Sequence, residues 1–407
     1  MEKVVPILAN RWAVLALLFF ARSSMAMQFQ SIPPISTLLV EELGFNFTQI
    51  GLLIGLWMLP GVFIALPGGL LGQRFGDKIV VIAGLGLQVA GALMFANANA
   101  FQMAFAGRLI CGVGAVAFNV QLTKIVNDWF AKKEISTSMG ILMTAWPFGI
   151  ALALFTLGHV ATIWDWRTAI YLITGYSFLS LLLVAILYHD QPLTEPKEPA
   201  PRRKLWIISR RELIIIIFAG MVWALPNAGF VILMGFMPAF FVSNGMEMAK
   251  AGMFVSLISW ITIGSIPLGG WFTDRTGRIN AFIIGGVLLN ALFIFLVPLG
   301  FSVLLCVLLL GVTIGGWPGA IMALPNQVLS SQSRSTGFGV FYMVFYGIVA
   351  ALVPVAGWLR DFTGEETASL QFGGILMILT VVALIFFRIL QQRWFAEEPG
   401  QLLESTI

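Results

Sequence analysis

Long apolar blocks almost free of charge recur along the whole chain, and no other feature constrains its fold as strongly. Division at Gly, Pro and polar breakers gives twelve blocks, at residues 12–35, 50–71, 79–97, 101–126, 136–159, 168–188, 212–242, 251–272, 280–298, 302–329, 336–359 and 370–391. A bilayer-spanning helix needs about 20 apolar residues. The chain is 59% hydrophobic and 10% charged, whereas soluble domains are about 25% charged. We therefore predict an all-α membrane protein with twelve transmembrane helices.

The basic residues are divided unevenly between the two sides of these helices. If the N-terminus is cytoplasmic, eighteen of the 23 Lys and Arg residues lie in cytoplasmic segments, and three (Arg167, Lys250 and Arg360) lie in outer loops. This asymmetry follows the positive-inside rule. It predicts a multi-pass protein of the plasma membrane, the bacterial inner membrane, with both termini in the cytoplasm. The net charge of +4 then reflects topology, and we expect no nucleic-acid partner.

One polar segment, residues 188–211, interrupts the apolar pattern near the middle of the chain. Its four prolines and its basic cluster at residues 202–204 are typical of a solvated loop near anionic lipid headgroups rather than of a docking site. We predict an N-terminal six-helix bundle at 1–190, a cytoplasmic linker at 191–211, a C-terminal six-helix bundle at 212–393 and a cytoplasmic tail at 394–407.

The two halves of the chain repeat each other. At an offset of 201 residues, residues 69–78 (GLLGQRFGDK) match residues 270–279 (GWFTDRTGRI), and both segments join the second and third helix of their half. Tandem six-helix halves are one way in which transporters are built, with the substrate site between the halves at mid-membrane. The repeat therefore predicts two pseudo-symmetric bundles.

These loops resemble the signature Gly-x-Leu-x-Asp-Arg-x-Gly-Arg-Lys of the major facilitator superfamily. The second copy keeps Gly270, Asp274, Arg275, Gly277 and Arg278, and the first keeps Gly69, Leu71, Arg74, Gly76 and Lys78. The first copy departs from the signature with Gln73 in place of Asp and Asp77 in place of Arg. Residues 108–115, 164–171 and 354–364 are similar to further motifs of this family.

The resemblance also has a weaker, finer component. Residues 28–32, 49–55 and 59–61 are similar to the bacterial branch that contains cyanate and 2-nitroimidazole transporters. On the fifth helix, Trp146 stands where the antiporter motif of the family has Gly, which argues against the drug-antiporter branches.

The resemblance implies that the loop acid closes the cytoplasmic side by docking at the N-terminus of a helix in the other half. Asp274 would face residues 136–138, and Gln73 would face residues 335–337. Because the helix dipole favours an acid over a neutral amide, we expect an asymmetric gate formed mainly by Asp274 and Arg275. The gating group is Gln73, Arg74, Asp274, Arg275 and Arg278. Alternatively, the loops only form tight turns at their glycines.

Charged residues are rare inside the predicted spans. No Asp or Glu lies in the interior of a span, whereas Arg22 lies near the middle of the first helix and Arg108 on the fourth. An unpaired guanidinium in the membrane is costly and usually marks a functional cavity. The simplest compensating charge is an anionic substrate, held by paired N–H bonds. A structural role, with bonds to backbone carbonyls, remains open for Arg22 and more so for Arg108.

In this family the first, fourth, seventh and tenth helices are expected to line the central cavity. The predicted substrate-binding residues are Arg22, Gln28, Trp223, Asn227, Phe230, Trp317, Tyr342, Tyr346 and Arg108. Pro318 should loosen the tenth helix near mid-span. An aromatic box with one cation and a few amides would suit a small, flat or partly apolar anion. Each aromatic residue taken singly is more typical of packing.

The most consistent function is a secondary active or facilitative transporter that moves a small carboxylate or oxyanion by alternating access. Efflux of apolar or cationic compounds is the first alternative, and a non-transporting membrane sensor is the second. We expect no enzymatic activity, cofactor or metal site, and a monomer whose partners are the substrate and the bilayer. The two cysteines, Cys111 and Cys306, lie inside apolar blocks and indicate no disulfide framework.

Overall fold

In the part of the chain that the structure describes, twelve helical segments are long and apolar enough to cross a membrane, which confirms the prediction from the apolar blocks. The computed structural model describes residues 10–64, 68–130, 134–189, 208–330 and 332–395. Its elements are α1 (Arg11–Phe29), η1 (Pro33–Ile35), α2 (Ser36–Leu43), α3 (Phe47–Gly55), α4 (Pro60–Ile64), α5 (Gly68–Phe75), α6 (Asp77–Ala96), α7 (Phe101–Phe130), α8 (Ile135–Ile163), α9 (Trp166–Leu187), α10 (Arg210–Ser243), α11 (Met248–Thr276), α12 (Ile279–Leu296), α13 (Val303–Ile314), α14 (Pro318–Met322), η2 (Pro325–Gln327), α15 (Arg334–Thr363) and α16 (Ala368–Phe395).

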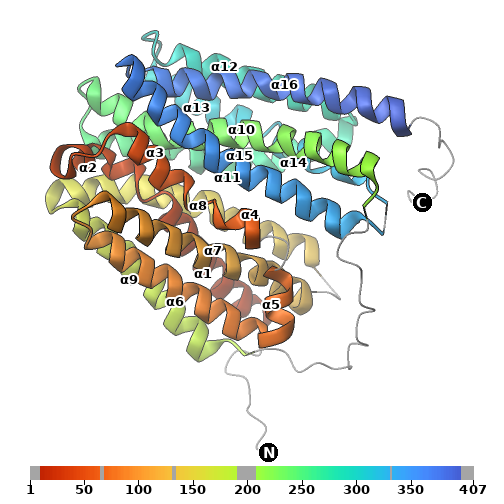
Figure 1. Cartoon of the computed structure of the whole chain (residues 1–407), viewed down its shortest axis with the longest axis horizontal. Coiled ribbons are helices and arrows are strands. Elements are labelled where there is room, and N and C mark those ends of the chain that lie inside the picture. The colour runs from red at the N-terminus through yellow and green to blue at the C-terminus, as the bar shows by residue number, and fades with distance from the viewer. Residues whose placement is uncertain (1–9, 65–67, 131–133, 190–207, 331, 396–407) are drawn as a thin grey trace, which may run out of the picture.

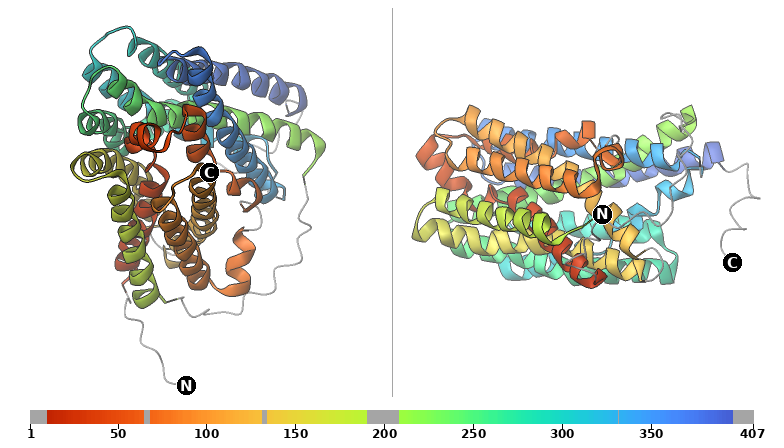
Figure 2. Two further views of the ribbon diagram at one scale, coloured as in Figure 1. Left: turned by 60° about the vertical axis from the view of Figure 1, so that its left-hand side comes forward. Right: turned by 90° about the horizontal axis from the view of Figure 1, so that it is seen from below.

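The spans form two groups, as predicted. Figure 1 shows α1–α9 in the lower part of the view and α10–α16 in the upper part, and Figure 2 shows the same division from two further sides. We call these groups the N-half and the C-half. The terminal end is the end at which α1 begins and α16 ends, and the far end is the opposite one, where α2 meets α3. The predicted linker 191–211 and tail 394–407 lie largely outside the described residues.

Three spans are interrupted, each next to a proline. α1 ends before Pro33, α3 ends before Pro60 and α13 ends before Pro318. Proline has no N–H, and its ring clashes with the carbonyl four residues earlier, so a helix does not run through it undisturbed. The expected loosening at Pro318 is present. The first two breaks correct the prediction of continuous helices at 12–35 and 50–71.

The main contacts between the halves are those of α3 with α15 and of α8 with α11, and smaller contacts join α4 to α15 and η1 to α10 and α11. Glycines permit the close approach, because a Cβ atom at Gly51 would lie 2.7 Å from the carbonyl oxygen of Val353. A Cβ atom at Gly252 would lie 2.4 Å from the carbonyl oxygen of Leu154. Small residues at such crossings let membrane helices pack backbone to backbone. Both glycines lie near the far-end start of their helices, so the halves are closely packed at the far end.

Candidate functional site between the halves

Arg22 of α1 lies at the boundary between the halves. Its side chain is 8% exposed, and its Nε and Nη1 atoms are buried without a hydrogen-bond partner in the described structure. Tyr342 and Tyr346 of α15 are close enough to interact with it electrostatically. These three side chains come from both halves. A buried guanidinium with free donors is costly in a membrane, so this position favours an anion.

The two tyrosines occupy one face of α15, as their four-residue spacing predicted. The ring of Phe345 lies 5.0 Å from that of Tyr346 and 6.4 Å from that of Tyr342. Gly61 of α4 makes room for Tyr346, since a Cβ atom at Gly61 would lie only 2.4 Å from the Cγ atom of the ring. Tyr346 is therefore half-buried, whereas Tyr342 is 37% exposed.

Aromatic rings continue from these tyrosines to Trp223 of α10. The Trp223 ring lies 6.1 Å from Phe345 and 6.4 Å from Phe341 between centroids. Its indole Nε1 is buried and has no partner in the described structure. Buried indole N–H groups usually find an acceptor. The ring cluster, defined as Trp223, Phe341, Tyr342, Phe345 and Tyr346, thus presents a free donor in addition to Arg22.

The other predicted residues of the C-half differ in their placement. Asn227 and Phe230 follow Trp223 on α10 and are half-buried. Asn227 donates its side-chain N–H to the carbonyl oxygen of Trp223 at 2.7 Å. Trp317 is 2% exposed, and its ring lies 5.9 Å from that of Trp223. Its N–H donates to Asn290 at 3.4 Å, so Trp317 supports Trp223 and does not offer a free donor.

Arg108 of α7 has the opposite environment to Arg22. Its Nε donates to the carbonyl oxygen of Leu53 at 2.9 Å, and its two terminal nitrogens donate to the carbonyl oxygens of Gln28 and Phe29 at 2.7 and 3.1 Å. These carbonyls lie beside the breaks in the first and second spans. The regular helical donor of Phe29 would be residue 33, a proline without an N–H. Arg108 thus satisfies backbone groups that the breaks leave open.

Gln28 does not join the group around Arg22. Its side chain is 1% exposed, and it donates to the hydroxyl of Ser177 at 3.4 Å inside the N-half. The same hydroxyl accepts a bond from Gln88 at 2.9 Å. The structure therefore brings together Arg22, Tyr342, Tyr346 and Trp223, with Asn227 beside Trp223. Gln28, Arg108 and Trp317 are in supporting positions, and Phe230 lies further along α10.

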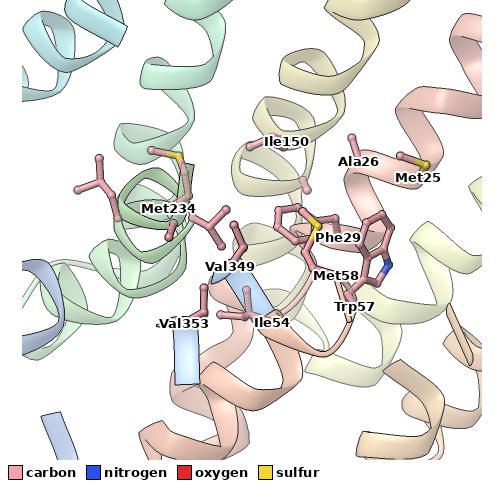
Figure 3. Packing of buried hydrophobic residues seen from close by; sticks show 14 of the residues in the cluster. Met25, Ala26, Phe29, Ile54, Trp57, Met58, Ile150, Met234, Val349 and Val353 are labelled. Carbon is pink, nitrogen blue, oxygen red and sulfur yellow. The ribbon is translucent and has the colours of Figure 1, made fainter. Parts of the chain in front are cut away.

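An apolar seal separates this group from the far end. Figure 3 shows Ile54 of the N-half beside Val349 and Val353 of the C-half, with Met234 of the C-half on one side and Met58 of the N-half, next to Phe29, on the other. These side chains are between 0% and 4% exposed. Val349 and Val353 follow the tyrosines along α15 toward the far end. A path from the central group to the far end is thus filled by side chains.

A polar latch adds to the seal at the far end. The carboxylate of Asp361, near the end of α15, accepts bonds from the backbone N–H groups of Phe47 and Thr48 at 3.0 and 2.6 Å, and from the Thr48 hydroxyl at 2.5 Å. The guanidinium of Arg360 lies 3.6 Å from the centre of the Phe47 ring. Asp361 thus caps the N-terminus of α3 in the other half, where an acid is favoured. The sequence contained Asp361 in a family motif but gave no sign of its partner.

The repeated loops lie at the terminal end. Arg74, Asp274, Arg275 and Arg278 are all exposed, and the side chain of Gln73 lies outside the described residues. Gly76 and Gly277 have φ angles of 86° and 65°, so both turns favour glycine. The side chain of Asp274 is exposed in this state. The latch at Asp274 stays a prediction for a state in which the terminal end is closed.

One ion pair beside the first loop was not anticipated. Lys124 of α7 donates to both carboxylate oxygens of Asp77 at 2.6 Å. Asp77 is the residue that replaces the Arg of the signature, and its position at the same predicted membrane edge as Lys124 could have indicated the pair. Within the described ranges, no three His, Cys, Asp or Glu side chains come together in a way that would hold a metal ion.

Comparisons with known proteins agree with this architecture. The family model described as Major Facilitator Superfamily matches residues 18–354. A hexuronate transporter of Bacillus subtilis (strain 168) is 23% identical over 374 residues, which cover 85% of this chain and 87% of the relative. A 3-(3-hydroxy-phenyl)propionate transporter of Escherichia coli (strain K12) is 26% identical over 291 residues, which cover 70% of each chain. The solved structure of a mutant of the nucleoside transporter NupG has a TM-score of 0.75 at 16% identity, and the match covers 94% of this chain and 100% of that one.

Proposed function

This chain belongs to the Major Facilitator Superfamily, and from that premise we propose that it carries a small organic anion across the membrane, with Arg22 as the residue that binds the anion. The chain is a multi-pass membrane transporter and not an enzyme. The proposal adds a class of substrate and a residue that recognises it.

One observation carries the proposal, the unpartnered guanidinium of Arg22 at the boundary between the halves. A carboxylate accepts two parallel N–H bonds from an arginine, so it would satisfy the donors that the protein leaves free. The buried polar residues of the described chain include no Asp or Glu, and a cationic substrate would lack a counter-charge. The relatives named for hexuronate and for 3-(3-hydroxy-phenyl)propionate bear names of organic anions, which agrees with this choice.

We also propose that transport proceeds by alternating access. The asymmetry of basic residues supports a cytoplasmic position for the terminal end. The apolar seal and the Asp361 latch would then close the outer side, and the state described would admit the anion from the cytoplasmic side. In the opposite state, Asp274 would dock at the start of α8 and close the terminal end. We propose that one chain suffices for this cycle.

Thermal stabilisation of the purified full-length protein tests the proposal. Small carboxylates should raise the melting temperature of the wild type, because a ligand at 100 times its Kd stabilises the folded state by about 2.7 kcal/mol. The Arg22→Ala variant should lose this response. Arg393→Ala is the matched control, since it removes an exposed arginine near the end of α16, and it should respond like the wild type. Stabilisation by amines alone, or an anion response that survives in Arg22→Ala, would contradict the proposal.

A further inference from the structure

We infer that the transported anion carries a single negative charge and has a flat, apolar body, as an aryl-substituted monocarboxylate does. This inference rests on the proposed function, in which Arg22 holds the anion. It follows from two separate features of the site, the number of free cationic groups and the nature of the surrounding side chains.

The supply of positive charge limits the charge of the substrate. The buried arginines of the described chain are Arg22, Arg108 and Arg360. Arg360 lies at the far end, against Phe47. All three nitrogens of Arg108 donate to backbone carbonyls, so this side chain has no free fork for a second carboxylate. A dianion at Arg22 would bury one carboxylate without a counter-charge, which is strongly unfavourable.

The side chains around Arg22 favour a planar apolar body. The ring cluster forms a continuous series with centroid distances of 5.0 to 6.4 Å. Phe230 adds a further half-buried ring on α10. Aromatic rings attract one another in stacked and edge-to-face arrangements. An aryl group could therefore continue the series from the point where Tyr342 is exposed.

The same site offers few partners to a polyhydroxylated acid. Asn227 uses its N–H group on the carbonyl oxygen of Trp223, and Trp317 uses its N–H on Asn290. Trp223 Nε1 is a free donor, which suits one additional acceptor atom. On binding, the several hydroxyls of a sugar acid would lose their hydrogen bonds to water, and the site would replace only some of them. Unmade hydrogen bonds of this kind discriminate strongly between ligands.

Competition binding on the full-length protein in nanodiscs tests the inference, with 3-phenylpropionate, D-glucuronate and L-tartrate as probes. We expect 3-phenylpropionate to bind at least about tenfold more tightly than either hydroxy acid. Trp223→Gln should reduce this ratio, because it replaces a ring by hydrogen-bonding groups, and Trp223→Phe should keep most of it. Trp271→Gln, which changes an exposed tryptophan of α11, should leave the ratio unchanged.

The outcomes separate the inference from the function on which it rests. Glucuronate or tartrate binding as tightly as 3-phenylpropionate, with loss of binding in Arg22→Ala, would overturn the inference and leave the proposed function intact. Absence of binding by all three anions would overturn both. Because the wild-type ratio alone decides between an aryl-substituted monocarboxylate and a polyhydroxylated acid, that comparison does not depend on whether a variant folds.

Discussion

Two buried arginines of the N-half show how the surroundings of a charge decide its role. Arg108 is bonded through every nitrogen to backbone carbonyls beside helix breaks. Arg22 has two buried nitrogens without partners in the described structure. Since each unmade bond of a buried donor is unfavourable, a fully bonded arginine stabilises the fold and an unbonded one is available to a ligand. We therefore propose a structural role for Arg108 and a role in substrate recognition for Arg22.

The structural assignment predicts the effect of Arg108→Lys. Lysine keeps the charge but lacks the planar fork that reaches three carbonyls, so we expect destabilisation by about 1–3 kcal/mol. Melting can be followed with a thiol-reactive dye, because Cys111 is 1% exposed and reacts only on unfolding. Arg393→Lys, an exposed substitution of the same kind, is the control. Equal melting temperatures for both variants would show that the carbonyl contacts of Arg108 are dispensable.

Sequence alone could locate these arginines but could not separate them. Both stand out because charges are rare in apolar blocks. The difference depends on the backbone carbonyls of Gln28, Phe29 and Leu53, which lie near the helix breaks and accept bonds from Arg108. Likewise, the four-residue spacing placed Tyr342 and Tyr346 on one face, whereas their position beside Arg22 depends on how the halves dock. The sequence also gave no sign that Gln28 bonds to Ser177 inside the N-half.

The helices α3 and α15 are joined by a latch that the repeated loops do not provide. Asp361 accepts two backbone N–H bonds at the N-terminus of α3, which belongs to the other half. Its arrangement resembles the one expected of Asp274 at the terminal end, an acid of one half docked on a helix start of the other. The two ends of the molecule would then be closed by the same physical device.

This latch predicts that Asp361→Asn opens the far end. Hydrogen bonds to charged groups contribute about 1.5–3 kcal/mol, so losing the charge should raise the open population about tenfold or more. Spin labels at Ala100→Cys and Glu365→Cys, both exposed at the far end, should report a longer distance. Asp165→Asn is the matched control, since Asp165 caps α9 through Thr168 within its own half. If Asp361→Asn and Asp165→Asn give the same distances, Asp361 does not hold the halves together.

The arrangement of twelve spans follows from solvent more than from any motif. Because a bilayer offers no hydrogen bonds to the backbone, every long apolar block has to become a helix. The spans predicted from the apolar blocks are therefore present in the structure. The breaks were harder to foresee, because Pro226 and Pro238 lie within the uninterrupted α10 while Pro33 and Pro60 end helices. Whether a proline interrupts a span depends in part on partners for the freed carbonyl, and at Pro33 Arg108 supplies one to Phe29 from another helix.

Docking of the halves at one end predicts how an anion would move them. Arg22 belongs to the N-half and the ring cluster belongs to the C-half. Arg22 and Trp223 occupy equivalent positions in the 201-residue repeat. An anion bound by Arg22 and packed on the rings would stabilise a state in which both halves approach it, and this draws the terminal end together.

Spin labels at Thr137→Cys and Thr276→Cys, exposed in opposite halves at that end, should show a shorter distance on addition of 3-phenylpropionate. Arg22→Ala should abolish the change, and Asp274→Asn should reduce the short-distance population by weakening the inner latch. Distances that stay constant at saturating anion would mean that substrate binding does not close the terminal end.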